Sequence, residues 1–170
     1  HFVMGVSAIF GIFAETYFWF PNMYGRMMNE TLGKWHFVLT FIGVYCIFMP
    51  MHYLGLAGNV RRYSAFTDEY MKGSLPLHRF ITYAALVTGA VQILFFINLF
   101  WSRFRGAVAP ENPWEATTLE WSTSSPPPFD NFGTWHPVVY RGPDEYGVEG
   151  PSGDFRMQAV PDRGGKGAPA

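Results

Sequence analysis

Cysteine and charged residues are scarce in this sequence of 170 residues. Its one cysteine, Cys46, cannot form an internal disulfide, a CxxC redox motif or a Cys-based zinc site. Charged residues make up 15 % of the chain, whereas soluble proteins average about 25 %. The formal net charge is −1, and no basic run is long enough to follow a nucleic-acid backbone. A disulfide scaffold is therefore excluded, and we expect no nucleic-acid partner.

A basic segment before the first apolar stretch is also missing. Secretory signal peptides begin with such a segment. Here the sequence opens with His1 and continues directly into an apolar run. We therefore expect no signal peptide, and we expect the sequence to be a piece of a longer polypeptide.

The sequence contains several long apolar runs with few charged residues. A helix needs roughly 20 mainly apolar residues to cross the hydrocarbon core of a bilayer. Three runs meet that length, at about 2–20, 36–58 and 79–101. The first contains Glu15, and the apolar stretches of the other two contain no Asp, Glu, Lys or Arg. Aromatic residues, which form 19 % of the chain, gather near the ends of these runs, as they do at membrane boundaries. The pattern predicts an all-α membrane protein with three transmembrane helices within residues 1–101.

The remaining segment, 102–170, has a different composition. It holds ten of the 13 prolines and much of the glycine. Proline removes a backbone donor and restricts φ, so regular elements of any length are disfavoured. We expect an irregular extramembrane tail, loosely ordered after about residue 132.

The basic residues alone do not fix the orientation in the membrane. Cytoplasmic loops usually carry an excess of Lys and Arg. One side of the predicted topology offers Arg26, Lys34, Arg103 and Arg105, and the other offers Arg61, Arg62, Lys72 and Arg79. The count is tied unless some of these side chains have another task.

Three histidines are candidate ligands, each with an alternative reading. His1 could bind iron from the head of the first run, or it could be a surface residue. His36 and His52 lie 16 residues apart, about 24 Å along a helix, so they cannot share one metal ion. For this pair, contact with lipid headgroups at His36 and a hydrogen bond to a neighbouring helix at His52 are the favoured interpretations.

Other polar groups also have two readings. Arg61 and Arg62 directly follow the second run and could grip carboxylates or phosphates, or lie in lipid headgroups. Glu15 could belong to a proton path, but pairing with Arg26 or Lys34 is favoured. Pro50 predicts a kink in the second helix, next to a cavity or simply at a helix contact.

Four strings, in order, resemble the C-terminal part of subunit I of haem–copper terminal oxidases. They are HFVMGVSAIFGIFAETYFWFP, GRMMNETLGKWHFVLTFIG, PMHYLGLAGNVRRY and NPWEATTLEWSTSSPPPFDNF. The similarity covers most of residues 1–132. It implies that the three helices are the last three of a twelve-helix bundle. Asn59-Val60 departs from the family's usual Met-Pro before the arginine pair, and Glu15 stands where small or apolar residues are common.

The resemblance implies roles for three residues. His1 matches the second histidine of the family's His-Phe-His motif, which is an axial ligand of the low-spin haem iron. Arg61 and Arg62 match the pair that binds haem propionates. These propionates lie toward the outer side, so the tail would lie on the cytoplasmic side. The high-spin haem ligand and the copper ligands would lie upstream of this sequence, and no catalytic residue is expected within it.

The implied function is that of cytochrome c oxidase. Such an enzyme reduces O2 to water and pumps protons, with electrons passing from cytochrome c through the low-spin haem to a haem–copper centre. The implied cofactors are haem, with haem A favoured, and copper. The implied partners are the rest of subunit I, subunits II and III, cytochrome c and membrane lipid, in a bacterial inner membrane. A quinol-oxidising relative, or a non-enzymatic membrane assembly or transport subunit, is the alternative.

Overall fold

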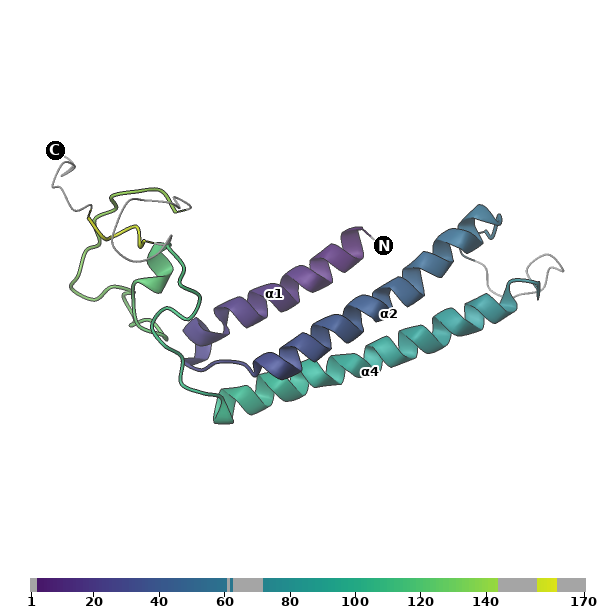
Figure 1. Cartoon of the computed structure of the whole chain (residues 1–170), viewed down its shortest axis with the longest axis horizontal. Coiled ribbons are helices and arrows are strands. Elements are labelled where there is room, and N and C mark those ends of the chain that lie inside the picture. Colours follow the sequence, from purple (N-terminus) through teal and green to yellow (C-terminus); the bar gives the residue numbers. More distant parts are fainter. Residues whose placement is uncertain (1–2, 61, 63–71, 144–155, 162–170) are drawn as a thin grey trace. The chain divides into compact units, whose positions relative to one another are not determined.

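The computed structural model describes residues 3–60, 62, 72–143 and 156–161. Within these residues the fold is all-α, as predicted: helices α1 (Met4–Tyr24), α2 (Glu30–Leu56) and α4 (Leu75–Arg105), and the short 3-10 helix η1 (Leu119–Trp121) (Figure 1). The described part contains no β-strand, only an isolated bridge between Arg26 and Val108. The chain divides into two compact units, one formed by 1–14 with 29–104 and the other by 15–28 with 105–170.

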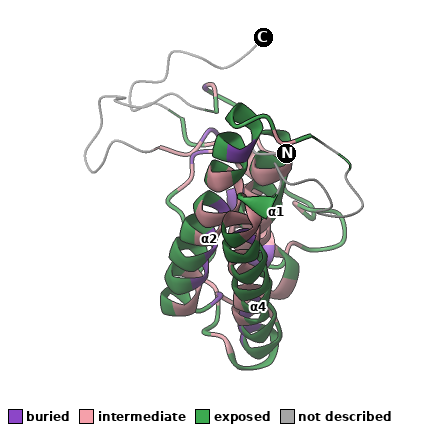
Figure 2. Ribbon diagram, turned by 90° about the vertical axis from the view of Figure 1, so that its right-hand side faces the viewer, coloured by how far each residue is buried: buried purple, intermediate pink, exposed green. Residues whose placement is uncertain are grey.

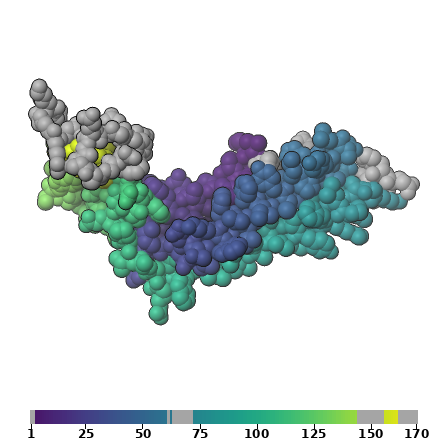
Figure 3. Space-filling view, in the orientation of Figure 1, coloured from purple at the N-terminus to yellow at the C-terminus, as the bar shows by residue number. Residues whose placement is uncertain are grey.

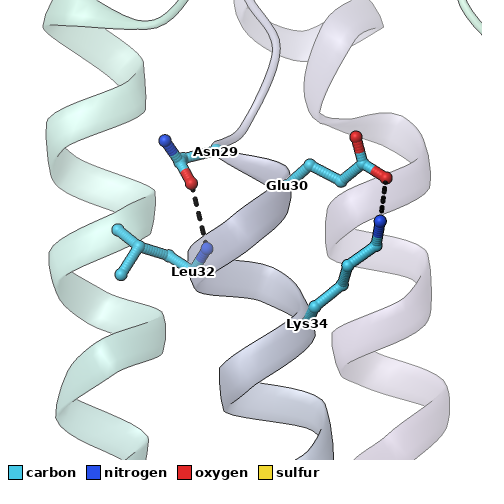
Figure 4. Close-up of polar contacts among 4 residues, drawn as sticks. All are labelled: Asn29, Glu30, Leu32 and Lys34. Carbon is cyan, nitrogen blue, oxygen red and sulfur yellow. Dashed lines mark hydrogen bonds and ion pairs between the residues drawn. The ribbon is translucent and has the colours of Figure 1, made fainter.

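Helix α2 begins with a side-chain cap. The Asn29 side chain accepts a hydrogen bond of 2.9 Å from the backbone N–H of Leu32, and Glu30 forms an ion pair of 2.7 Å with Lys34 one turn later (Figure 4). Asn is among the favoured capping residues because its oxygen satisfies a donor that the first turn leaves unpaired. The helix therefore starts six residues before the predicted run at 36, and it continues through Pro50 to Leu56.

Helices α2 and α4 lie side by side and antiparallel in the first unit (Figures 1 and 3). At one end, the Asn98 side chain accepts from the backbone N–H of Asn29 at 3.0 Å and donates to its carbonyl at 2.9 Å. Ser102 adds a hydroxyl bond of 2.9 Å to Asn98 Oδ1. Asn98 is fully buried, and these hydrogen bonds satisfy its side-chain amide, as buried polar groups require.

Close contact between these helices continues at Gly43. A Cβ placed on Gly43 would lie 2.9 Å from Thr88 Cγ2 and 3.0 Å from Thr88 Cβ. Only hydrogen fits this space, so glycine permits the close approach of α2 to α4, as small residues do between membrane helices.

The outward surfaces of α2 and α4 are mostly exposed in this chain (Figure 2). Both helices are long and apolar enough to cross a membrane, and only 17 % and 11 % of their most apolar windows are buried. A buried core helix of a soluble protein would have a much larger buried share. Crossing by α1 remains a prediction, as do the predicted span limits, because helix ends do not mark the edges of a bilayer.

The second unit shows that the described part of the tail is ordered. Gln158 donates its backbone N–H to Thr117 O at 2.8 Å and accepts from the Tyr140 N–H at 2.9 Å. Its side chain accepts from the Leu119 N–H at 3.2 Å and donates to Arg141 O at 3.2 Å. The expectation of loose order after residue 132 is therefore wrong for residues 140, 141 and 158. One buried amide joins segments that the sequence pattern could not bring together.

Candidate functional site

The C-terminal end of α2 is fixed by a glycine turn. The Asn59 N–H donates to Leu54 O, and the Gly58 N–H donates to Gly55 O, each at 3.0 Å. Gly58 has φ of 88°, a left-handed conformation that glycine adopts without steric cost. This is the Schellman arrangement, which satisfies carbonyls left unpaired at a helix end. It stops the helix just before the arginine pair.

The Asn59 side chain ties this turn to the start of α4. Its Nδ2 donates to Ser74 Oγ at 3.3 Å and lies 3.0 Å from His78 Nε2. Because the asparagine amide is the donor, Nε2 of His78 accepts, and its proton lies on Nδ1. We call Asn59, Ser74 and His78 the loop clamp. Nothing in the sequence pattern pairs residues 59 and 78.

Arg62 lies three residues after Asn59 of the loop clamp. It has φ of 61°, which is uncommon for a residue with a side chain, and the residue is exposed. His1 and Arg61, the other two predicted cofactor-binding residues, lie outside the described residues. An exposed guanidinium suits an anionic partner such as a carboxylate, because arginine stays charged and offers paired donors.

His36 lies deep between the helices, so the expectation that it reaches lipid headgroups is wrong. It is 2 % exposed, and its Nε2 is 3.0 Å from Gln92 Oε1. Phe13 contacts it edge-on at a centroid distance of 4.6 Å, and Gln92 continues the contact with a bond of 3.2 Å to Thr40. This polar group is satisfied inside the helix contact, as buried polar groups in membranes must be.

His52 lies on the exposed side of α2. Its Nδ1 is 2.8 Å from the carbonyl oxygen of Phe48 in the same helix, whereas a hydrogen bond to a neighbouring helix was expected. In the part of the chain that the structure describes, no three His, Cys, Asp or Glu side chains lie close enough to hold a metal ion.

Glu15 has a different partner from the expected one. Its Oε2 accepts a hydrogen bond of 2.7 Å from the indole N–H of Trp19. Arg26 donates to Gly106 O at 2.7 Å, and Lys34 pairs with Glu30. The predicted pairing of Glu15 with Arg26 or Lys34 is therefore wrong, because both cations have nearer partners.

Comparison with known proteins decides the family. The sequence profile described as "Cytochrome C and Quinol oxidase polypeptide I" matches residues 1–87, which is more than half of the sequence. The chain belongs to this family. The resemblance that the four strings indicated is thereby confirmed, and together with the two long apolar helices it shows an integral membrane protein.

Curated relatives agree over most of the chain. The alternative cytochrome c oxidase subunit 1 of Bradyrhizobium diazoefficiens is 46 % identical over 164 residues, covering 95 % of this chain and 28 % of the relative. The cytochrome c oxidase subunit 1 of Synechocystis is 47 % identical over 149 residues, covering 88 % of the chain and 26 % of the relative. That of Bacillus subtilis is 37 % identical over 158 residues, covering 92 % and 25 %.

Two facts follow from these alignments. The chain spans about a quarter of the length of the curated relatives it matches. The first relative covers 95 % of the chain, so similarity extends into the tail beyond residue 132, where the sequence motifs had ended.

Proposed function

We propose that this chain is the C-terminal part of the catalytic subunit of a respiratory terminal oxidase. The complete enzyme would reduce O2 to water, translocate protons and take electrons from cytochrome c. The family match over residues 1–87 carries this proposal. The names of the relatives, all cytochrome c oxidase subunits, support cytochrome c as the donor.

The chain's own contribution would be to hold a haem. His1 would be an axial ligand of the low-spin haem iron, and Arg61 and Arg62 would bind its propionates. Haem, when bound, supplies a one-electron carrier. The guanidinium of Arg62 would neutralise a carboxylate without exchanging a proton, because arginine does not titrate in the physiological range. The glycine turn and the loop clamp would limit where Arg62 can lie.

Copper and the second haem would be held elsewhere. The described residues lack a group of metal-binding side chains, and the chain covers only about a quarter of its relatives. We therefore assign the copper ligands and the high-spin haem ligand to the rest of subunit I. Subunits II and III would be the other protein partners.

The proposed orientation places Arg62 toward the outer side of a bacterial plasma membrane. Because α2 and α4 are antiparallel, the chain leaves α4 at the end opposite Arg62. The tail would then lie on the cytoplasmic side. The three relatives described above come from bacteria, which supports this location.

A reduced-minus-oxidised spectrum of the detergent-solubilised complex tests the proposal, together with extraction of its haem. We expect two haem signals, one of which shifts with carbon monoxide, and haem A in the extract. Oxidation of added cytochrome c, and not of a quinol, would identify the donor. A complex that is intact but contains no haem would refute the assignment.

Arg62→Gln tests the propionate role separately. Removing a positive charge near the haem disfavours the added electron, so the reduction potential of the low-spin haem should fall by roughly 30–60 mV, about three- to tenfold in the one-electron equilibrium. Arg79→Gln, at an exposed arginine in the first turns of α4, is the matched control and should leave the potential unchanged.

A further inference from the structure

Glu15 is the acidic residue of the first apolar run, and its position is unusual. It lies four residues before Trp19 in α1, about 6 Å along the helix axis. Trp19 belongs to the aromatic cluster 17–20, which is typical of the membrane–water boundary. In the predicted span 2–20, Glu15 would therefore lie about one turn deeper in the membrane than the ring that marks the boundary. A carboxylate at that depth is costly unless it is paired.

The Trp19 ring is turned toward this carboxylate. An indole at the boundary usually offers its N–H to headgroups or water. Here the N–H donates to Glu15 Oε2 at 2.7 Å, to the residue one turn earlier in the predicted span. Trp121 of η1, which is 2 % exposed, stacks on Trp19 with a centroid distance of 5.8 Å and an interplanar angle of 16°.

These contacts hold the carboxylate in place. The stacking restrains the Trp19 ring, and its N–H restrains one oxygen of Glu15, so the side chain is kept from extending outward to water. The residue as a whole remains exposed in this chain. Arg26 and Lys34 are the next two cations along the chain, and each has another partner. Arg26 donates to Gly106 O, and Lys34 pairs with Glu30. A fixed, exposed anion at this depth is complementary to a cation from outside the chain.

We propose that Glu15 is a docking point for a Lys or Arg side chain of a neighbouring membrane helix that lies outside residues 1–170. Lipid amines are the less suitable source, because headgroups lie outside the aromatic boundary whereas Glu15 lies inside it. The neighbouring helix would thus be joined to α1 by an ion pair whose anion is oriented by Trp19.

Labelling of native membranes with dicyclohexylcarbodiimide, followed by digestion and mass spectrometry, identifies the partner. A protonated carboxyl adds to the carbodiimide, its proton going to nitrogen and its oxygen to carbon. An adjacent Lys amine then attacks the acyl carbon, forms an amide and releases dicyclohexylurea. Without a nearby amine, the acyl group moves to the urea nitrogen and a stable acylurea remains on the glutamate.

The charge itself is tested by Glu15→Gln in the complete protein. Glutamine keeps an acceptor for the Trp19 N–H and removes only the charge. We expect the solubilised complex to dissociate at least about tenfold faster at a fixed temperature, because loss of one partner of a desolvated pair acts on the dissociation rate. Glu111→Gln, at an exposed carboxylate of the tail, should leave the rate unchanged.

The outcomes separate the possible sources. An amide between Glu15 and a lysine of another membrane helix supports the proposal. An unmodified Glu15 together with fast dissociation of the Glu15→Gln complex also supports it, and indicates that the partner is arginine. An acylurea on Glu15, an amide to phosphatidylethanolamine, or a Glu15→Gln complex as long-lived as Glu111→Gln would overturn it. None of these readouts depends on haem or oxygen reduction.

Discussion

Asn59 Nδ2 lies 3.0 Å from His78 Nε2, and this contact closes the loop between α2 and α4 at its base. The two residues are separated by 19 positions in the sequence. Asn59-Val60 precedes the arginine pair in this chain, where the family resemblance led us to expect Met-Pro. Proline restricts the chain through its ring, whereas here a side chain restricts it through hydrogen bonds.

Asn59→Ala should therefore loosen the loop that carries the arginine pair. Each hydrogen bond that is lost contributes about 0.5–1.5 kcal/mol. We expect trypsin to cleave at Arg61 and Arg62 several-fold faster in native membranes. Ser74→Ala removes only one of the two side-chain bonds and should have the smaller effect. Equal cleavage of the Asn59→Ala and unaltered proteins would show that the clamp does not restrain the loop.

A second prediction concerns the buried amide at the other end of α2. Asn98→Ala removes one acceptor of the Asn29 N–H and one donor to the Asn29 carbonyl, while Ser102 Oγ and the Gly33 N–H remain as partners. Each hydrogen bond that is lost contributes about 0.5–1.5 kcal/mol. We expect a clear fall in the midpoint of thermal unfolding of the solubilised protein. Ser102→Ala should cost less, because Asn98 Oδ1 still accepts from the Asn29 N–H. A larger effect at Ser102 would contradict this order.

The fold could be predicted from the sequence where a local pattern specifies it. Uncharged apolar runs predict helices, Asn29 before Glu30 is a typical helix start, and Gly58 a typical end. Helix limits were harder to place, because composition indicates where hydrocarbon could lie and not where backbone hydrogen bonds end. Thus α2 begins at Glu30, well before its apolar stretch.

The candidate site could be predicted from the sequence only in part. The arginine pair could be named as a candidate because its motif is local, and its role stays a prediction. The partners of His36 and Asn59 could not be predicted, because Gln92 and His78 lie far away in the sequence, on α4. The Trp19 partner of Glu15 was missed as well. Charge alone favoured Arg26 or Lys34 as the partner of Glu15. In the structure, however, Arg26 donates to a backbone carbonyl and Lys34 pairs with Glu30 one turn earlier.

Trp121 gives a third prediction. Its ring is buried against Phe18 and Trp19, and its Nε1 has no hydrogen-bond partner among the described residues. Trp121→Phe should therefore be tolerated, because the smaller ring loses contact area but also removes an unpaired buried donor. Trp121→Ala should cost about 3–5 kcal/mol, since it leaves a large cavity. Thermal unfolding of both variants measures the difference, and similar losses in the two would show that Nε1 has a partner that matters.

The last prediction tests the contact between α2 and α4 at Gly43. Gly43→Ala places a methyl group 2.9 Å from Thr88 Cγ2 and 3.0 Å from Thr88 Cβ. Rotation of the threonine side chain moves Cγ2 but leaves the tight contact with Cβ. Overpacking of this kind costs about 1–3 kcal/mol, which the midpoint of thermal unfolding should show. Thr88→Ala in the same protein should restore part of the stability, because it removes Cγ2 and leaves only the tight contact with Cβ. Gly89→Ala, one residue away from Thr88 in sequence, is the matched control, because a Cβ there meets no atom within 4 Å. If Gly43→Ala and Gly89→Ala unfold at the same temperature, α2 and α4 do not approach as closely in the membrane as they do here.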